Sequence, residues 1–454
     1  MKQPRQMPDK SWNTPRWKGI ARPYTGADVD RLKGTVQIEY SLARAGAEKF
    51  WKLLQSQPLI PALGALNPNQ AVEMAQAGLK TVYLNVCQLN GCNPSAYGDA
   101  PNPAHSVPAV VRAVNHALLR VDQVFHSRRQ SARDWMLPIV AEGDPVFGDS
   151  ISGFDAMKNL IEAGVAAVHF DDQLPAARRC GSTDAKTLIP VEDAIQKLIS
   201  ARLAADVMGV STVIIARTDA ESAAYISSDH DERDRKFITS ERLPGGNCLY
   251  KGGLQAAIDR ALAYAPYADL LWCEMSELDL EKARKFAEAI HAQCPGKLLA
   301  YNCSPRFHWR AKLNEDDIAC FQRDLAAMGY RFQFISLAGY HMLNLSMYQF
   351  AKDYLQSGMT AYSQIQQLEL EMAKQLGHDR VRRDETSGTS FLAEVGAIQN
   401  GNQPDPKSHQ LRLVGHGEPD EVDYNDGEAT ERTPLPQLYP SPEPAPLPMA
   451  AAAD

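Results

Sequence analysis

Four acidic residues follow short apolar runs of the sequence, and together their carboxylates could do chemistry. They are Glu142, Asp144, Asp171 and Glu274. Converging carboxylates repel one another at neutral pH unless a cation neutralises them. Oxygen-only ligands of this kind suit Mg²⁺, with Mn²⁺ as the alternative ion, because Mg²⁺ keeps waters and accepts substrate oxygens. One polar residue at a strand end is unremarkable because such ends meet water, so the prediction depends on several occurring together.

Arg217 ends another apolar run and could anchor a substrate carboxylate, since the guanidinium fork matches two carboxylate oxygens. A structural salt bridge to Asp219 or Glu274 explains the same residue equally well. Both interpretations stay open at the level of sequence.

Cys180 lies in RRCGSTDAK, a glycine-containing stretch too polar for a protein core. The neighbouring Arg178 and Arg179 favour the thiolate form by lowering the pKa of the thiol. Structural cysteines usually lie in apolar runs, as Cys273 and Cys303 do. We therefore interpret Cys180 as a reactive residue.

Eight apolar runs rich in β-branched residues predict the strands that position these side chains. The runs are PALGAL (61–66), TVYLNV (81–86), LPIVAEG (137–143), AAVHFDD (166–172), TVIIART (212–218), LLWCEM (270–275), LLAYNC (298–303) and RFQFIS (331–336).

Amphipathic helical patterns separate these runs, and several of the patterns end in glycine. Strands that alternate with helices and are apolar on both faces predict a parallel sheet. Eight such units fit an α/β fold of the (β/α)₈ TIM-barrel type, whose chemistry lies at the carboxyl ends of the strands. A doubly wound open sheet is the alternative, although no G-x-G-x-x-G follows the first strand.

Composition limits the possible partners and location. The chain has 454 residues, 44% of them hydrophobic, and a formal charge of −8. Residues 401–454 hold ten acidic and three basic side chains, so the rest of the chain is nearly neutral and unlike a nucleic-acid-binding protein. The first twenty residues contain no apolar stretch typical of a signal peptide or membrane span, which predicts a cytoplasmic protein. Its eight scattered cysteines are expected to be reduced.

From about Trp17 to Gln399 the sequence resembles isocitrate lyase, a member of the isocitrate lyase and phosphoenolpyruvate mutase superfamily. The matching runs are long and specific: RWKGIARPYTGADVDRLKG, SLARAGAEKFWKLL, PALGALNPNQA, ARLAADVMGVSTVIIARTDAE, YAPYADLLWCEMS, PGKLLAYNCSP and MGYRFQFISLAGYHMLN.

This resemblance implies a homotetramer with exchanged C-terminal helices. It also implies Mg²⁺-dependent cleavage of a 2-hydroxy tricarboxylate into succinate and glyoxylate. In it, Cys180 exchanges a proton with the substrate, Tyr83 acts on the substrate hydroxyl, and Asp99 joins the four acidic residues at the metal. Substrate-binding residues carried over are Asn85, Val86, Cys87, Gly181, Ser182, Arg217, Asn302, Ser304, Arg306 and Ser336.

Several of the matching positions depart from the family's pattern. The family's Ser-Gly-Trp, which holds glyoxylate, reads Asn85, Val86 and Cys87, and its Asp-x-Glu reads Glu142, Gly143 and Asp144. The Glu of its Glu-Asp-Gln is Asp171, the His after its Cys-Gly is Ser182, the second Ser of its Ser-Pro-Ser is Arg306, and its Thr after the last strand is Ser336. Valine adds bulk where a bare backbone approached the ligand, and Arg306 adds a fixed positive charge.

Three functions are compatible with these departures. The first is a repurposed Mg²⁺-dependent lyase, or a condensing enzyme, that acts on a different 2-hydroxy or 2-oxo acid. The second is a conventional isocitrate or methylisocitrate lyase. The third is a non-catalytic regulatory or assembly protein, which the cost of an unneutralised carboxylate cluster disfavours. We predict the first.

The predicted organisation has four parts. Residues 1–57 form an N-terminal helical segment, 58–350 the catalytic barrel, 351–403 a C-terminal helical segment, and 404–454 an acidic tail. Ten prolines from Pro404 to Pro448 predict that this tail is disordered.

Overall fold

The computed structural model describes residues 12–85, 103–127, 133–143, 150–174, 186–243, 246–375 and 389–401. The chain divides into two compact units, Met1–Gln403 and Pro404–Asp454, and the second lies outside the described residues. Among the described helices, none has the length and apolar character needed to cross a bilayer.

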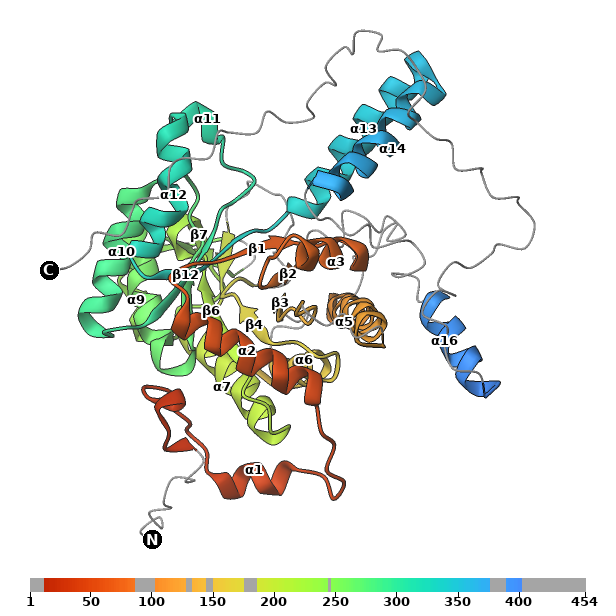
Figure 1. The fold of residues 1–454 in the computed structure, drawn as a ribbon. Helices are drawn as coiled ribbons and strands as arrows, with labels where there is room; N and C mark the ends of the chain where they lie inside the picture. Colours follow the sequence, from red (N-terminus) through yellow and green to blue (C-terminus); the bar gives the residue numbers. More distant parts are fainter. Residues whose placement is uncertain are drawn as a thin grey trace, which may run out of the picture. The chain divides into compact units, whose positions relative to one another are not determined.

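Eight parallel strands close into a barrel in the order β1-β12-β11-β10-β6-β4-β3-β2 (Figure 1). Each lies within or next to one of the eight predicted runs, so the barrel is confirmed and the open sheet is excluded. The strands are β1 (Ile60–Gly64), β2 (Val82–Leu84), β3 (Ile139–Glu142), β4 (Ala167–Phe170), β6 (Val213–Thr218), β10 (Leu270–Cys273), β11 (Leu298–Asn302) and β12 (Tyr330–Ile335).

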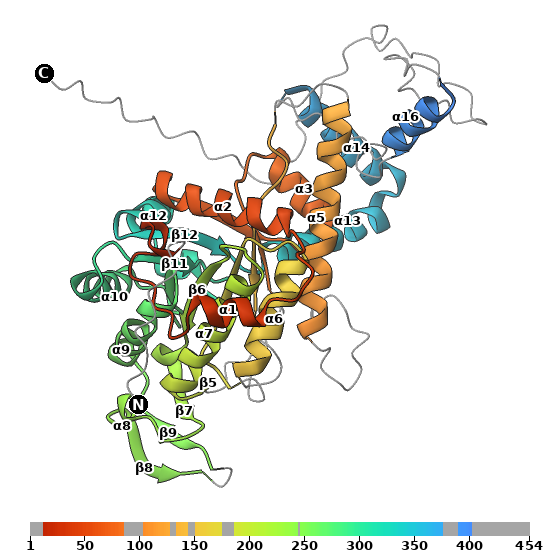
Figure 2. The ribbon, with the colours of Figure 1, turned by 90° about the horizontal axis from the view of Figure 1, so that it is seen from below.

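Helices that connect these strands cover the outside of the barrel (Figures 1 and 2). They are α3 (Pro68–Gln76), α5 (Pro103–Ser127), α6 (Ser150–Glu162), α7 (Val191–Val207), α9 (Leu254–Tyr264), α10 (Leu280–Gln293) and α12 (Glu315–Ala327). Side-chain caps begin several of them: Asn67 accepts from Gln70, Asp279 from Lys282, and Asn314 from Asp317.

Helix α2 (Ser41–Ser56) closes the amino-terminal end of the barrel. Its Phe50 and Leu54 join the cluster of residues that fills the barrel interior. The Phe50 ring lies edge-on to Phe332 of β12, with 5.4 Å between centroids. The opposite, carboxyl end of the barrel is therefore the end available to a ligand.

The segment before α2 is held under the barrel by a buried ion cluster. It contains a short 3₁₀ turn (Pro15–Trp17) and α1 (Gly26–Leu32). Arg16 and Arg202 donate to the two oxygens of Asp269 at 2.6 and 2.5 Å, and Asp269 also accepts from the backbone N–H of Ile214. Both arginines stack on the ring of Trp17. This tryptophan-containing run has a structural role in the described part of the chain.

A second sheet of four short strands interrupts the barrel connections, in the order β5-β7-β9-β8. Its strands are β5 (Lys186–Leu188), β7 (Ala223–Ile226), β8 (Ile238–Arg242) and β9 (Cys248–Tyr250), and α8 (Glu232–Arg235) lies among them. The sequence pattern did not predict this sheet, because its strands have three to five residues and carry polar side chains.

Two long helices follow β12, namely α13 (Ala338–Ser357) and α14 (Met359–Gln375), and a shorter α16 (Thr389–Gln399) comes later. Helices α13 and α14 pack on each other, with Phe350 and Tyr362 in ring contact. Much of their apolar surface is exposed, most of all at Tyr348 (70%) and Leu355 (88%).

Candidate active site

The alternation of side chains along each strand decides which residues face the barrel interior. Tyr83, Val140, Ile215, Trp272 and Phe334 are among the interior residues. Two residues further along each strand, the same inner face carries polar groups at the carboxyl end of the barrel. These groups are Asn85, Glu142, Asp171, Arg217, Glu274, Asn302 and Ser336. The fold thus brings seven of the predicted site residues to one end of the barrel.

The order of the strands places the guanidinium of Arg217 between the acidic side chains. Going round the barrel, the residues lie on or directly after successive strands, in the order Glu274 (after β10), Arg217 (β6), Asp171 (after β4) and Glu142 (β3). Burial alone would lower the pKa of Arg217, but Asp219, Glu274 and Asp171 outweigh it and raise this pKa well above its ordinary value. Part of the repulsion expected among the carboxylates is therefore relieved by Arg217.

Arg217 forms the salt bridge with Asp219 that the sequence left as one of two interpretations. Its Nε and Nη2 donate to the two Asp219 oxygens at 2.8 and 3.0 Å. Lys186 donates to the same carboxylate at 2.6 Å. Burial would raise the pKa of Asp219, but Arg217 and Lys186 hold it below its usual value, so Asp219 stays ionised. Within the described residues, Nη1 of Arg217 makes no hydrogen bond, which leaves that edge of the fork for another acceptor.

The ring of Trp272 lies beneath Arg217, with the guanidinium carbon 4.5 Å from its centroid. The register pairs the two residues across β6 and β10. This contact favours the charged guanidinium and limits the directions in which Arg217 can point.

Glu142 and Asp171 are two buried carboxylates whose oxygens are of the kind that Mg²⁺ prefers. They lie on neighbouring strands, and each is only 3% exposed. Gln173 donates to Asp171 through both its backbone and its side chain, at 3.2 Å. Among the described residues, no three His, Cys, Asp or Glu side chains group closely enough to hold an ion. Two carboxylate ligands from the protein are nevertheless compatible with Mg²⁺, because this ion usually keeps several water ligands.

Tyr83 lies one layer below these groups and is 2% exposed. Its hydroxyl is 2.9 Å from Nε2 of His169, and its ring stacks on Phe334. Burial, followed by the charge of Arg217, keeps the pKa of His169 well below its ordinary value, so this imidazole is neutral. The structure places Tyr83 in the barrel interior; its contact with a substrate hydroxyl stays a prediction.

The far side of the site comes from β10, β11 and β12. Asn302 donates to Glu274 at 3.3 Å, and Oδ1 of Asn302 is buried without a hydrogen-bond partner among the described residues. Ser304 is buried and accepts from the backbone N–H of Arg306 at 3.3 Å. Arg306 itself is exposed, and its side chain pairs with no described carboxylate.

Seven predicted site residues lie outside the described part of the chain: Val86, Cys87, Asp99, Asp144, Cys180, Gly181 and Ser182. The two ends of the segment that contains Cys180 are nevertheless fixed. The N–H of Leu174 donates to the carbonyl of Thr187 at 2.8 Å, and Lys186 binds Asp219. Leu174 and Lys186, the described residues on either side of 175–185, therefore lie beside the candidate site.

Several residues that build the site were not singled out as site residues from the sequence. Lys186 fixes Asp219, and Lys197 of α7 donates to the carbonyl of Asp171 at 2.7 Å. Asp172 faces away from the barrel and binds Thr218. The alternation of inward and outward side chains along AAVHFDD could have distinguished the inward Asp171 from the outward Asp172. No signal in the sequence marks Lys186 or Lys197 as part of the site.

Comparison with known proteins identifies the family. A sequence model of the isocitrate lyase family matches residues 6–245 and 239–403. The chain belongs to the isocitrate lyase family. It is 48% identical over 398 residues to isocitrate lyase of Halalkalibacterium halodurans, which covers 87% of this chain and 93% of that protein. Isocitrate lyase of Escherichia coli K12 is 47% identical over 406 residues, which cover 86% of this chain and 93% of that protein. Isocitrate lyase 1 of Mycobacterium tuberculosis is 45% identical over 415 residues, which cover 90% of this chain and 96% of that protein.

Solved structures agree on the fold. A phosphoenolpyruvate phosphomutase from Streptomyces platensis aligns with a TM-score of 0.51 and 15% identity, over 78% of this chain and 98% of that one. Oxaloacetate acetylhydrolase in complex with 3,3-difluorooxalacetate aligns with a TM-score of 0.50 and 19% identity, over 80% and 99%. At such identities the likeness shows the barrel alone. As a member of the isocitrate lyase family, the chain is a lyase, and this family generally uses a divalent metal.

Proposed function

We propose that this lyase cleaves isocitrate into succinate and glyoxylate with Mg²⁺. The observation that carries the proposal is the inner-face arrangement in which Arg217 lies between Asp171 and Glu274. The identity of 45–48% to three isocitrate lyases over most of the chain supports isocitrate better than the different acid that the altered motifs predicted.

The proposed metal ligands are Glu142 and Asp171, together with Asp144, Asp99 and Glu274, directly or through water. When bound, Mg²⁺ supplies positive charge that stabilises the anionic oxygens of the substrate and product. Mn²⁺ is the alternative ion.

In the proposed mechanism, Arg217 receives a substrate carboxylate on Nη1, which no described residue binds, while Asp219 holds Nε and Nη2. The substrate hydroxyl loses its proton, with Tyr83 as the proposed acceptor or relay, and an oxo group forms there. The carbon–carbon bond breaks, and its electron pair stays on the succinate carbon. Cys180, carried on a segment anchored beside Arg217, gives that carbon its proton.

The far end of the substrate is assigned to Asn302, Ser304, Arg306 and Ser336, with Asn85, Val86 and Cys87 on the glyoxylate side and Gly181 and Ser182 beside Cys180. Glu274 orients Asn302 through their hydrogen bond. The buried Oδ1 of Asn302, which has no hydrogen-bond partner in the described part of the chain, supports a bound donor at this position. Because Arg306 is exposed and pairs with no carboxylate among the described residues, we assign it to a substrate carboxylate.

The test is glyoxylate release from isocitrate by the purified protein with Mg²⁺, repeated with methylisocitrate and assayed for pyruvate. Turnover that needs the metal supports the proposal. Absence of both products, with Mg²⁺ binding retained in calorimetry, would move the assignment to another 2-hydroxy or 2-oxo acid.

A function on another 2-hydroxy or 2-oxo acid is favoured by one observation. The guanidinium of Arg306 is exposed at a position where the family carries a hydroxyl. We expect Arg306→Ser to change the preference among acids. If Arg306 selects a different acid, kcat/KM for isocitrate should rise about tenfold in the variant, which corresponds to the free energy of about one hydrogen bond. If isocitrate is the substrate, the variant should instead lose activity through a higher KM. Steady-state kinetics separate the outcomes, with Arg310→Ser, an exposed neighbour, as the control.

We further propose that copies of this chain assemble through α13 and α14. The resemblance to isocitrate lyase implies that the assembly is a tetramer. The exposed apolar side chains there include Met347, Tyr348, Leu355, Met359 and Tyr362, more than isolated surface positions would explain. A cytoplasmic location stays a prediction.

We expect Leu355→Glu to shift the protein to smaller assemblies, because a carboxylate would be buried without a partner in the interface. Light scattering after size exclusion measures the mass. Gln356→Glu adds the same charge at the next exposed residue and should leave the mass unchanged. Equal masses for both variants would argue against this surface.

A further inference from the structure

The outer faces of β4 and β6 are joined just behind the active site. Asp172 and Thr218 each follow an inward-facing residue, so they point away from the barrel interior. Thr218 donates its hydroxyl to Asp172 at 2.7 Å, and the backbone N–H of Asp219 donates to the other Asp172 oxygen at 2.8 Å. Because Asp172 is only 1% exposed, both hydrogen bonds are shielded from water.

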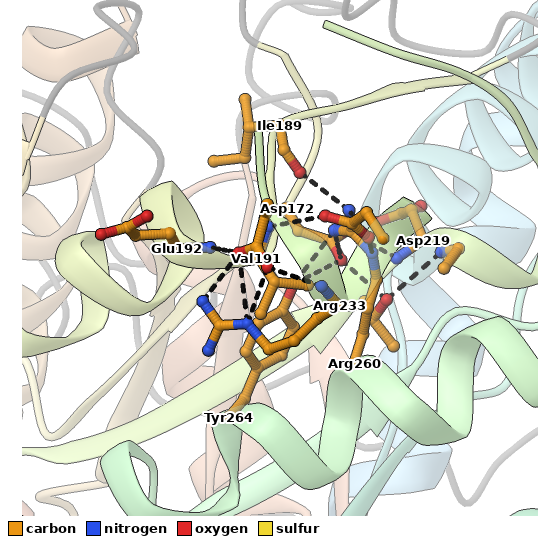
Figure 3. A network of polar contacts seen from close by, with 12 residues as sticks. Asp172, Ile189, Val191, Glu192, Asp219, Arg233, Arg260 and Tyr264 are labelled. Atoms are coloured by element: carbon orange, nitrogen blue, oxygen red, sulfur yellow. Dashed lines mark hydrogen bonds and ion pairs between the residues drawn. The ribbon is translucent and has the colours of Figure 1, made fainter. Parts of the chain in front are cut away.

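Arg260 of α9 completes this connection from outside the barrel (Figure 3). Its Nη1 donates to Asp172 at 2.9 Å, and its Nη2 donates to Asp234 at 2.8 Å and to the carbonyl of Ile189 at 3.0 Å. The hydroxyl of Tyr264 donates to Asp172 at 3.0 Å. One buried guanidinium thus links α9, α8 and the segment after β5 to the ends of two barrel strands.

The inner residues next to this connection are those of the site. Asp171 immediately precedes Asp172, and Arg217 immediately precedes Thr218. Asp219 is shared: its backbone is bound by Asp172, while its carboxylate binds Arg217. A displacement of Asp172 relative to Thr218 would therefore change the separation of Asp171 from Arg217.

We propose that Asp172 and Arg260 are positioning residues, which set the distance between the metal-side carboxylate Asp171 and the substrate anchor Arg217. This inference rests on the proposed function, since it assumes that both residues contact one substrate complex. The alternative is a buried ion pair that contributes to stability alone. The two interpretations differ in what a mild substitution does to the folded enzyme.

Thr218→Val is the main test, because it removes one hydroxyl and keeps the shape of the side chain. Thr212→Val is the matched control: Thr212 lies just before the same strand, is fully buried, and has no partner for its hydroxyl among the described residues. Thr218→Ser restores the hydroxyl. Arg260→Lys keeps the charge but removes the fork that reaches both Asp172 and Asp234.

We expect Thr218→Val to lower kcat for isocitrate about 10- to 100-fold, with a smaller change in KM, because misplaced groups cost most in the transition state. Thr218→Ser should recover most of the rate, Thr212→Val should match the unaltered protein, and Arg260→Lys should fall with Thr218→Val. All rates are measured where circular dichroism shows each variant fully folded. Lower stability with unchanged kcat in folded Thr218→Val would overturn the inference.

Binding of oxalate with Mg²⁺, measured by calorimetry, separates this inference from the proposed function. If isocitrate is not cleaved but oxalate binds more weakly to Thr218→Val than to Thr212→Val, the positioning role stands and the substrate assignment falls. If isocitrate is cleaved equally by both variants, the positioning role falls. If the unaltered protein neither cleaves isocitrate nor binds oxalate, both fall.

Discussion

Replacing Arg217 with lysine is expected to lower kcat/KM about 100- to 1,000-fold while the barrel stays folded, an effect comparable to losing a preorganised donor in an active site. Arg217 gives Nε and Nη2 to Asp219 and keeps Nη1 for a ligand. A lysine ammonium can approach Asp219 or the substrate, but it cannot present two separate edges to both. The charge above Trp272 is retained, so the loss would come from geometry.

Steady-state kinetics with isocitrate and Mg²⁺ measure this effect, and urea unfolding checks the fold. Arg235→Lys is the matched control, since Arg235 forms an exposed pair with Glu232 on the surface helix α8. That variant should show unaltered kinetics. Activity of Arg217→Lys within a few-fold of the unaltered protein would mean that Arg217 serves the salt bridge alone.

Asp269→Asn is expected to lower the free energy of unfolding by about 3 kcal/mol, because it removes the carboxylate that binds the buried Arg202 and the partly buried Arg16. Asp269 receives Arg16, Arg202 and the N–H of Ile214, and it is 5% exposed. The same change removes one of the contacts that hold the N-terminal segment, while Arg22 and Tyr24 keep theirs with Asp206. Urea unfolding at pH 7 measures the loss, and Asp229→Asn, which breaks the exposed pair with Arg242, should cost less than about 1 kcal/mol.

The pH dependence gives an independent check on Asp269. Burial would raise the pKa of this carboxyl, but Arg202 and Arg16 hold it below its usual value in the folded protein. The unfolded chain therefore takes up a proton first as pH falls, and the stabilisation is complete above about pH 5. At pH 3.5 the advantage of the unaltered protein over Asp269→Asn should therefore be smaller than at pH 7, by up to about 1 kcal/mol. A constant difference between pH 7 and 3.5 would contradict the assignment.

The barrel strands could be predicted because they are buried on both faces and read as continuous apolar runs. The strands of the second sheet could not, since Lys186–Leu188 and Ile238–Arg242 are short and partly polar. Their positions depend on pairing between segments that are distant in sequence. The pairing of Thr187 in β5 with Tyr225 in β7 is one such contact.

The inner-face residues could be predicted in part, because alternation follows from local sequence. Whether Arg217 binds Asp219 or a ligand could not be decided, since both need the same residue type at the same place. The structure shows the first contact and leaves an edge for the second. The surroundings of Asp171 also depend on Lys197, whose role follows from how α7 packs and not from any local pattern.

The fixed ends of residues 175–185 have an evolutionary consequence. Leu174 pairs with Thr187, and Lys186 binds Asp219, so the residues that make these contacts all lie outside 175–185. A relative can therefore replace a single residue in that range, as the family's His is replaced by Ser182, and keep both contacts. The substrate-side residues of the range and the strands that carry Arg217 and Asp171 can then evolve separately.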